Sequence, residues 1–315
     1  MKGWSVVSKK NILPYICAVI VFCIWGLSFI FTKQAIVNVD VYHFLGLRFG
    51  TAAIVLLVLK LLNIIKLNYT KEDLYKLLLL STIQPLAYFI LEINALKVNT
   101  TSEVGIMMAL IPVFVAILAP FFLDEKPSKS QFAFILMSVS GVIFMIVMKG
   151  LTLQINLYGM SILLLAVISG AFYNILARKF SSDCTPVEIT FVMMWLGAIV
   201  FNSISIYKHI RLGNLNEYFV PLQDNNVLIS VLYLGILASI VAFFLFNYNL
   251  SKLSASNVAV FANFTTVVSI LAGVFIYGEP FYWYQVVGTI IILIGVAGTN
   301  YLGTKDHLKV QDERR

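Results

Sequence analysis

Among the charged side chains inside or at the edge of long apolar stretches of this chain, three are candidates for function. Arg48 falls within the stretch 41–62, Glu92 near the end of 74–96, and Glu103 at the start of 102–123. A charged group in hydrocarbon usually faces a partner or a water-filled cavity, and it is a candidate for binding a charged solute or a proton. Arg48 and Glu92 fall at comparable depths, so an ion pair between them is the simplest hypothesis. Glu103 is better explained as a carboxylate at a helix N-terminus, balanced by nearby Lys97.

Glu92 is the stronger candidate of the two acids because it lies deeper in its apolar stretch. It stands one helical turn from Tyr88 and two from Gln84. A carboxylate in that position could take up and release a proton, or it could attract a cationic or zwitterionic solute. The sequence leaves both roles open.

A second group of candidates is polar or aromatic without being charged, and its members lie at mid-depth in apolar stretches from both halves of the chain. The hydrogen-bonding members are Ser28, Gln84, Asn174, Asn247 and Asn263, and their aromatic neighbours are Trp25, Phe29, Tyr88, Tyr173 and Phe243. Together they predict an aromatic cavity with a few hydrogen-bonding groups, which is typical of a site for a small organic solute. The alternative is that each Asn or Ser only joins two helices, contributing about 1 kcal/mol.

Pro112 lies near the centre of the stretch 102–123. A proline inside a helix removes one backbone hydrogen bond and frees a carbonyl one turn earlier, here that of Met108. That carbonyl could bind a solute, and both residues are therefore candidates for the cavity. The alternative is a kink that helps the helices to pack, which membrane helices tolerate.

The cysteines, histidines and short motifs of the sequence give little support for a catalytic or metal-binding site. Cys17 and Cys23 lie in the first apolar stretch and Cys184 in a polar connection, so no pair suits a disulfide framework or a metal site. The three histidines, His43, His209 and His307, are scattered along the sequence without metal-ligand spacing. Nucleotide-binding and nucleophile motifs are also missing from the sequence. We expect no catalytic residues, no metal and no cofactor, and hence no enzyme.

The elements that must position these residues are ten apolar stretches of roughly twenty residues, the length that crosses a bilayer core of about 30 Å. Mean hydropathy is +0.92 and 12% of residues are charged, which leaves no room for a soluble domain. The sequence therefore predicts an all-α integral membrane protein with ten transmembrane helices. The predicted helices are 12–33, 41–62, 74–96, 102–123, 130–148, 157–177, 187–207, 227–250, 255–277 and 282–302.

Basic residues predict the orientation, because Lys and Arg are retained on the cytoplasmic side during insertion. With the N-terminus inside, 16 of the 22 basic residues lie in cytoplasmic segments and only Lys97, Lys149, Lys208 and Arg211 lie outside. Both termini, 1–11 and 304–315, are expected in the cytoplasm. The net charge of +7 is thus a signal of topology and does not indicate a nucleic-acid partner.

The chain contains an internal repeat. A shift of 154 residues aligns 96–142 with 250–296 without a gap, and the matches include Ser102 with Ser256, Glu125 with Glu279, Gln131 with Gln285 and Gly141 with Gly295. Each half, 12–150 and 151–303, holds five predicted helices. Because five is odd, the second half must enter the membrane inverted, an arrangement typical of secondary transporters with a midplane site between the halves.

Three local patterns have structural interpretations. Ser128 followed by Gln131 predicts a capping box that opens a helix. The turn at Glu125 is expected to be structural or to link the two halves. Gly46 and Gly50 form a small-xxx-small pattern, which predicts close packing within the bundle in preference to a dimer contact.

The repeated segments "ALKVNTTSEVGIMMALIPVFVAILAPFFLDEKPSKSQ" and "NLSKLSASNVAVFANFTTVVSILAGVFIYGEPFYWYQ" resemble the paired signature of the EamA domain family of the drug/metabolite transporter superfamily. The "CIWGLSFIFTK" of the first stretch and Arg48 are similar to the start of the same domain. The resemblance covers nearly the whole chain. Two departures are Thr266, which replaces the proline of Pro112, and Tyr282, which replaces the hydroxyl of Ser128.

This resemblance implies a permease that moves a small organic metabolite across a bacterial cytoplasmic membrane by alternating access. An amino-acid-like solute is the first expectation, with drugs or other metabolites as alternatives, and export is favoured over import. The expected partners are the lipid bilayer, the solute and possible coupling protons, and the oligomeric state is left open. A non-transporting membrane receptor or scaffold is the alternative class.

Overall fold

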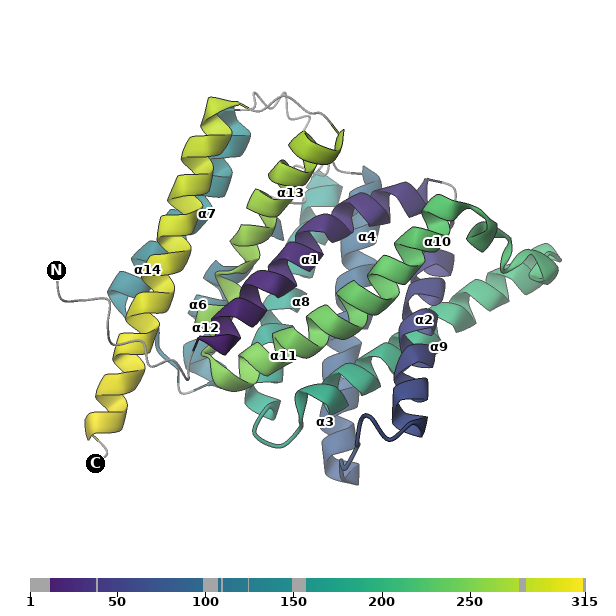
Figure 1. Ribbon diagram of the computed structural model, residues 1–315, viewed down its shortest axis with the longest axis horizontal. Coiled ribbons are helices and arrows are strands. Elements are labelled where there is room, and N and C mark those ends of the chain that lie inside the picture. Colours follow the sequence, from purple (N-terminus) through teal and green to yellow (C-terminus); the bar gives the residue numbers. More distant parts are fainter. Residues whose placement is uncertain are drawn as a thin grey trace.

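The computed structural model describes residues 12–37, 39–98, 107–108, 110–123, 125–148, 157–277 and 282–313. All regular secondary structure within these ranges is helical (Figure 1). The helices of the first half are α1 (Leu13–Ile36), α2 (Val41–Leu61), α3 (Lys71–Ser81), η2 (Thr82–Ala87), α4 (Tyr88–Val98), α6 (Ile111–Phe122) and α7 (Lys129–Met148). The second half contains α8 (Leu157–Phe180), α9 (Pro186–Leu212), η3 (Leu215–Glu217), η4 (Val220–Gln223), α10 (Asn225–Leu232), η5 (Tyr233–Val241), α11 (Ala242–Lys252), α12 (Ala255–Ala259), α13 (Ala262–Tyr277) and α14 (Trp283–Glu313).

Seven helical segments in the described ranges are long and apolar enough to cross a membrane. They are Leu13–Ile36, Val41–Leu61, Lys71–Ala95, Tyr158–Phe180, Pro186–Leu212, Asn225–Lys252 and Trp283–Leu302. These segments confirm an all-helical integral membrane fold and match seven of the ten predicted helices. The other three predicted helices correspond to α6, α7 and the pair α12 and α13, so the count of ten remains a prediction.

The expected position of Pro112 in mid-helix is wrong. Helix α6 begins at Ile111, and Pro112 therefore lies in its first turn, where a missing backbone N–H costs nothing. The preceding segment is described only at Met107, Met108 and Leu110. Pro112 thus lies at the start of α6.

Large apolar side chains cover much of the outer surface. Phe121 is 78% exposed, Phe275 82% and Leu61 71%. In water this pattern would be unfavourable, because burial of apolar area drives folding. In a lipid bilayer an exposed apolar surface is favourable, because the surrounding acyl chains are also apolar. This agrees with the hydropathy of the chain.

The two halves of the sequence are interleaved in space. Helices α2 and α9 pack along their length, as do α7 and α14. Helix α1 of the first half packs on α11 and α13 of the second, and α8 of the second half packs on α4 and α6 of the first (Figure 1). Each of these pairs joins residues from opposite sides of position 150, so the core is shared by both halves.

Glycines permit the closest approach between α7 and α14. A Cβ added at Gly141 would lie 2.9 Å from the carbonyl oxygen of Gly288, and one added at Gly295 would lie 2.6 Å from the backbone nitrogen of Ser138. Gly141 and Gly295 are equivalent positions of the internal repeat. A side chain at either would force the two helices apart.

Two of the long segments contain a π-helical stretch. In η2 the helix is interrupted at Gln84, whose backbone is extended (φ −142°, ψ 119°). The 154-residue shift places 82–87 on 236–241, which lies inside the second π-helical stretch, η5. Carbonyl oxygens in both accept a hydrogen bond from another helix, Ile83 from Ser169 Oγ (3.1 Å) and Ala238 from Trp25 Nε1 (3.1 Å). Such stretches are frequent at functional sites.

The predicted capping box before α7 is confirmed. The backbone N–H of Ser128 donates to Gln131 Oε1 (3.0 Å), and that of Gln131 donates to Ser128 Oγ (3.3 Å). At the equivalent start of α14, Gln285 Oε1 accepts from the backbone N–H of Tyr282 (2.8 Å). One half of the box therefore survives the loss of the hydroxyl at Tyr282.

Candidate functional site

Arg48 lies in the middle of α2 and is 4% exposed. Its Nε donates to Ser239 Oγ in η5 (2.9 Å), and its guanidinium lies 4.7 Å from the ring centroid of Phe89 and 5.3 Å from that of Phe49. Helix η5 approaches α2 closely here because position 235 is glycine. A Cβ at Gly235 would lie 2.9 Å from the carbonyl oxygen of Arg48. The cation is therefore enclosed by both halves of the chain.

Glu92 lies in α4 and is 8% exposed. Its Oε1 accepts a hydrogen bond from the hydroxyl of Tyr88 (3.0 Å), one helical turn earlier. The same hydroxyl lies 3.6 Å from the sulfur of Met108. The predicted association of Glu92 with Tyr88 is thus present, and Met108 joins it through its side chain instead of its carbonyl.

The predicted direct ion pair between Arg48 and Glu92 is not formed. Among the described residues, no nitrogen–oxygen distance of 4.0 Å or less joins the two groups, and the ion pairs lie elsewhere. Each charge instead bonds to a neutral hydroxyl, and the Phe89 ring packs against the guanidinium. Two opposite charges are therefore buried near one another within the helical bundle without neutralising each other by contact.

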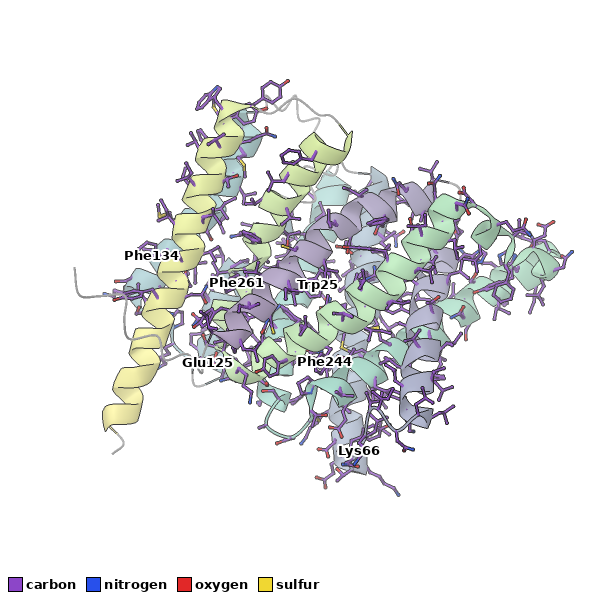
Figure 2. The ribbon with its side chains drawn as sticks, viewed as in Figure 1. Trp25, Lys66, Glu125, Phe134, Phe244 and Phe261 are labelled. Carbon is purple, nitrogen blue, oxygen red and sulfur yellow. The ribbon has the colours of Figure 1, made fainter. Side chains whose placement is uncertain are left out.

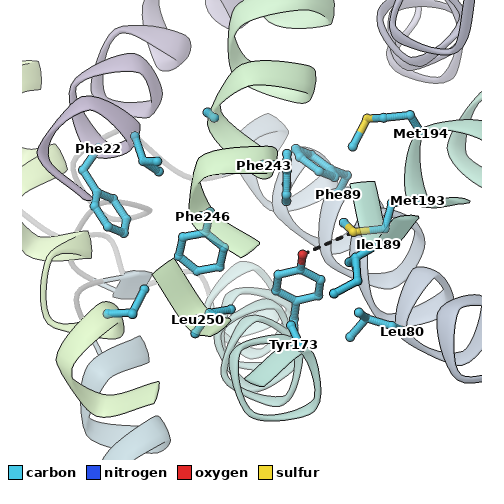
Figure 3. Close-up of a cluster of buried hydrophobic side chains, with 14 of the residues drawn as sticks. Phe22, Leu80, Phe89, Tyr173, Ile189, Met193, Met194, Phe243, Phe246 and Leu250 are labelled. Atoms are coloured by element: carbon cyan, nitrogen blue, oxygen red, sulfur yellow. Dashed lines mark hydrogen bonds between the residues drawn. The ribbon is translucent and has the colours of Figure 1, made fainter. Parts of the chain in front are cut away.

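Four of the predicted cavity residues form one buried cluster beside these charges. Tyr173 donates to Asn247 Oδ1 (2.6 Å), and the rings of Tyr173 and Trp25 contact Phe243 with centroids 6.2 and 5.1 Å apart. Asn247 Nδ2 donates in turn to Thr190 Oγ1 (3.2 Å). Tyr173 and Phe243 are each 1% exposed (Figure 3), and Asn247 is 0% exposed, so these three side chains are packed against their neighbours.

The remaining predicted cavity residues are not brought to this cluster by hydrogen bonds. Ser28 Oγ donates to Ile24 and Asn174 Nδ2 to Gly170, each within its own helix. Asn263 Nδ2 donates to Ser138 Oγ of α7 (2.8 Å), and thus joins two helices. Gln84 is buried at the interruption in η2, and Pro112 is buried at the start of α6. Glu103 and the side chain of Phe29 lie outside the described residues.

Among the described candidate residues, two side-chain amide oxygens are buried without a hydrogen-bond partner. They belong to Asn174 and Asn263, which are 6% and 0% exposed. An unsatisfied buried acceptor costs about 1–3 kcal/mol, which is an unusual expense for a residue that only joins helices. Both therefore keep their status as candidates.

Several residues of the site were not found from the sequence. Ser239 is a single serine in an apolar stretch, and nothing in its pattern pointed to Arg48. Phe22 and Phe246 complete the aromatic cluster, with ring centroids 6.0 Å apart (Figure 3). The ring centroid of Phe22 also lies 5.5 Å from that of Trp25. Met193 Sδ lies 3.2 Å from the Tyr173 hydroxyl (Figure 3). In a sequence with 24 Phe and 9 Met, such residues do not stand out.

Chemically, this arrangement can bind and orient but offers little for catalysis. The described residues contain no group of three or more His, Cys, Asp or Glu that could hold a metal ion. The charged, hydroxyl and aromatic groups suit a small solute with a polar head. The fold and site together define a multi-pass helical membrane protein with buried charges between its halves.

Comparison with known proteins identifies the family. The model of the EamA-like transporter family matches residues 12–147 and again 157–301. A Bacillus subtilis protein named as uncharacterized transporter YcxC is 35% identical over 295 residues, covering 93% of this chain and 95% of that protein. A protein of Escherichia coli named as a probable amino-acid metabolite efflux pump is 21% identical over 285 residues, covering 89% and 92%. A solved crystal structure shares the fold, with a TM-score of 0.74, 16% identity, and coverage of 92% of this chain and 98% of the other.

The chain belongs to the EamA-like transporter family. It is a multi-pass membrane protein, and its family membership indicates a transporter in preference to an enzyme.

Proposed function

We propose that the protein is a secondary transporter that exports a small organic metabolite, with an amino-acid-like solute as the first candidate. The observation that carries this proposal is the pair of buried charges, Arg48 and Glu92, each hydrogen-bonded to a neutral hydroxyl. Charges at that depth in a membrane are costly and usually serve a solute or an ion pathway. The amino-acid metabolite efflux pump named among the relatives adds weight to the choice of solute and direction.

Alternating access is supported by the way the halves share the core. Residues 12–150 and 151–303 are proposed as inverted repeats, and the family model matches each of them separately. Helix α1 packs on the second half and α8 on the first, as expected for two related units that exchange their leading helices. Rocking of one unit against the other would open the site between them to either side in turn.

The two π-helical stretches, η2 and η5, support a solute site beside Arg48 and Glu92. Irregular backbone at membrane depth is tolerated where it is buried in protein or lines a cavity. Here η2 directly precedes Tyr88, and η5 contains Ser239, which bonds to Arg48. Both charges are therefore adjacent to a segment whose backbone can offer carbonyl groups to a solute.

Glu92 is proposed to carry the coupling proton. Its hydrogen bond comes from Tyr88, a neutral donor, and its carboxylate is not neutralised by a cation within 4 Å among the described residues. A carboxylate buried without a cationic partner in contact can take up a proton in the closed site and release it when the site opens to water. Arg48 would then orient the carboxylate of the solute.

The proposal is tested by flux in proteoliposomes. Purified protein is assayed for uptake and counterflow of a panel of radiolabelled amino acids and metabolites, with and without an imposed pH gradient. We expect one class of solute to accumulate with the gradient. E92Q should abolish the dependence on the gradient, and E72Q, at the exposed start of α3, should leave it unchanged.

Three results would contradict parts of this proposal. Gradient-independent exchange by the natural chain would remove the proton from the mechanism while leaving a transporter. An unaltered response to the gradient in E92Q would assign coupling to another group. No flux of any compound through protein shown to be folded and inserted would favour a receptor or scaffold.

A further inference from the structure

Two histidines that are 166 positions apart in the sequence meet at one end of the bundle. His43 lies in the first turn of α2 and His209 in the last turn of α9. His43 Nδ1 and His209 Nε2 are 3.2 Å apart, and the rings are nearly perpendicular at 80° with centroids separated by 4.7 Å. Both side chains line a cavity of about 700 Å³ beneath the segment that carries η3 and η4, so water can reach them.

The two outer ring nitrogens both face oxygen acceptors. His43 Nε2 lies 2.8 Å from the carbonyl oxygen of Tyr218. His209 Nδ1 lies 3.3 Å from the carbonyl oxygen of Asn214 and 3.0 Å from its side-chain Oδ1. A backbone carbonyl can only accept, so each outer nitrogen must carry a hydrogen. The amide of Asn214 is oriented by its own donation to Glu217 Oε2 (3.3 Å), which leaves Oδ1 toward His209.

A count of protons follows from these contacts. The two outer N–H groups and the inner nitrogen–nitrogen hydrogen bond require three ring protons. Two neutral imidazoles supply only two. The geometry therefore matches a pair that carries one additional proton, shared across the 3.2 Å contact.

We propose that His43 and His209 form a single proton-binding site, which takes up one proton and thereby fastens the segment 214–218 to the ends of α2 and α9. Histidine is the side chain whose charge ordinarily changes between pH 5 and 8, so the site can respond to the surrounding water. After loss of the proton, either two nitrogen lone pairs face each other across the 3.2 Å contact, or one ring gives up its outer N–H bond to the segment 214–218. In both cases the segment is held less firmly to the ends of α2 and α9.

The charged groups around the pair permit this positive charge. Asp40 caps α2 and forms an ion pair with Lys208 of α9 (3.0 Å), Arg211 follows on α9, and Glu217 lies on η3. Burial alone would raise the pKa of Asp40, but hydrogen bonds and the charge of Lys208 outweigh it and lower that pKa. Asp40 therefore stays negative throughout the range in which imidazoles titrate.

Tyr218 is a further titratable neighbour, and its ring contacts both histidines with centroids 4.4 and 5.3 Å apart. Burial raises the pKa of Tyr218, so its hydroxyl stays neutral in that range. Two acidic and two basic side chains thus surround the pair, and their charges balance. A metal ion is a poorer occupant, because no third His, Cys, Asp or Glu completes a ligand set among the described residues.

The site is placed to influence transport, an inference that rests on the proposed function. Helix α2 belongs to the first half and α9 to the second, and they pack along their length. Tyr218 also donates to Asn202 Oδ1 of α9 (2.5 Å), and Asn202 Nδ2 donates to the carbonyl oxygen of Gly46 on α2 (3.0 Å). Binding of the proton would therefore strengthen a contact between the two halves that alternating access must change.

The test uses ¹⁵N NMR of the full chain, labelled at histidine and reconstituted in lipid nanodiscs. The chain has three histidines, and His307, far from the other two in sequence, serves as the reference. We expect the signals of His43 and His209 to move together through one shared step, separate from that of His307. A second proton should bind only at much lower pH, because two like charges would then lie about 3 Å apart.

Substitutions then test whether the two histidines share one proton or only titrate over the same pH range. In H209Q, His43 should lose the shared step, and H43Q should have the same effect on His209. H307Q is the matched control and should leave both signals unchanged. Two rings that titrate independently in the natural chain, or that both remain neutral at pH 5, would overturn the proposal without recourse to any variant.

A flux measurement distinguishes this inference from the proposed function. If the liposomes show no flux while the NMR step is present, the transport proposal fails and the proton site stands. If flux occurs and its pH profile is the same in H209Q as in the natural chain, the regulatory role is overturned. A pH profile that flattens in H209Q and not in H307Q would support it.

Discussion

The carboxylate of Glu125 joins three parts of the chain that are distant in sequence. Its Oε1 accepts a hydrogen bond from Arg178 Nε of α8 (2.7 Å), and its Oε2 accepts from the backbone N–H of Ala255 at the start of α12 (2.8 Å). Arg178 Nη1 also donates to the carbonyl oxygen of Leu250 (2.9 Å). In Figure 2 Glu125 is labelled just below Phe261, on the left of the bundle. The sequence-based expectation of a structural link between the halves at this turn agrees with these contacts.

Loss of this link should destabilise the protein. In E125Q and R178Q we expect the free energy of unfolding to fall by about 1.5–3 kcal/mol, the range for hydrogen bonds to charged groups, because both side chains are only about one-fifth exposed. The double variant should lose less than the sum of the single losses. Unfolding in mixed detergent micelles measures this, with K126Q at the neighbouring exposed position as control. Strict additivity would show that the two groups act independently.

Packing between α7 and α14 depends on the absence of side chains at its glycines. G295V should cost about 1–3 kcal/mol of stability, because a Cβ at that position would lie 2.6 Å from backbone and side-chain atoms of Ser138. The control is I294V on the same helix, whose side chain is 47% exposed. Both are compared by thermal unfolding in detergent. Equal melting temperatures for the two variants would mean that the helices separate without cost.

The Tyr173–Asn247 hydrogen bond should contribute to the stability of the buried cluster. Y173F removes the donor and leaves the Asn247 carbonyl oxygen buried without it, which should cost about 1–2 kcal/mol. Y158F, at a tyrosine that is 70% exposed, is the matched control. Thermal unfolding measures stability, and the flux assay measures any change in transport. An increase in stability for Y173F would indicate that the polar group is retained for function at a structural expense.

The Asp40–Lys208 pair should make stability depend on acidic pH. The pKa of Asp40 is lowered in the folded protein, so its contribution is complete above the ordinary value of about 3.9 and is lost as pH falls through the lower folded value. D40N should therefore lose less stability than the natural chain on acidification below about pH 4. K208Q should move the loss to higher pH. Melting curves between pH 3 and 7 test both, and identical curves for D40N and the natural chain would contradict the prediction.

Orientation can be tested at the two ends of the bundle. Lys66 lies in the connection after α2 and is predicted to be cytoplasmic (Figure 2). Leu212 lies at the end of α9 and is predicted to be external. Both side chains are exposed. In a background with Cys17, Cys23 and Cys184 replaced by serine, L212C should react in intact cells with a maleimide that does not cross the membrane. K66C should react only after the cells are opened. The reverse pattern would invert the predicted topology.

The residues that were found from sequence alone are those whose type is unusual for their surroundings. Arg48 and Glu92 stood out because charges are rare in apolar stretches, and both are buried as expected. Their partners did not stand out. Ser239 and Phe89 are ordinary residues in a hydrophobic chain, and only the approach of η5 at Gly235 and the turn of α4 bring them to the guanidinium. For the same reason the hypothesis of a direct ion pair, which considered depth alone, was wrong.

The histidines give the clearest contrast. In the sequence His43 and His209 are separated by 166 residues and show no pattern, and they were regarded as scattered. In the structure the packing of α2 on α9 places their ring nitrogens 3.2 Å apart. Packing of this kind depends on positions without a side chain, such as Gly46, which leaves room for Asn202 of the facing helix. The periodicity of the sequence does not show which residue will occupy that space.

The sequence by itself determined that this chain is a multi-pass helical membrane protein, and it predicted apolar helices of about twenty residues in two related halves. These properties follow from hydropathy, length and repetition, which are local or can be compared along the chain. The tertiary structure decided which residues meet: Glu125 with Arg178, Arg48 with Ser239, and His43 with His209. In lipid, the apolar surface of one helix is as well solvated as that of another, so the choice of neighbours rests on small residues and a few hydrogen bonds that only the assembled bundle brings together.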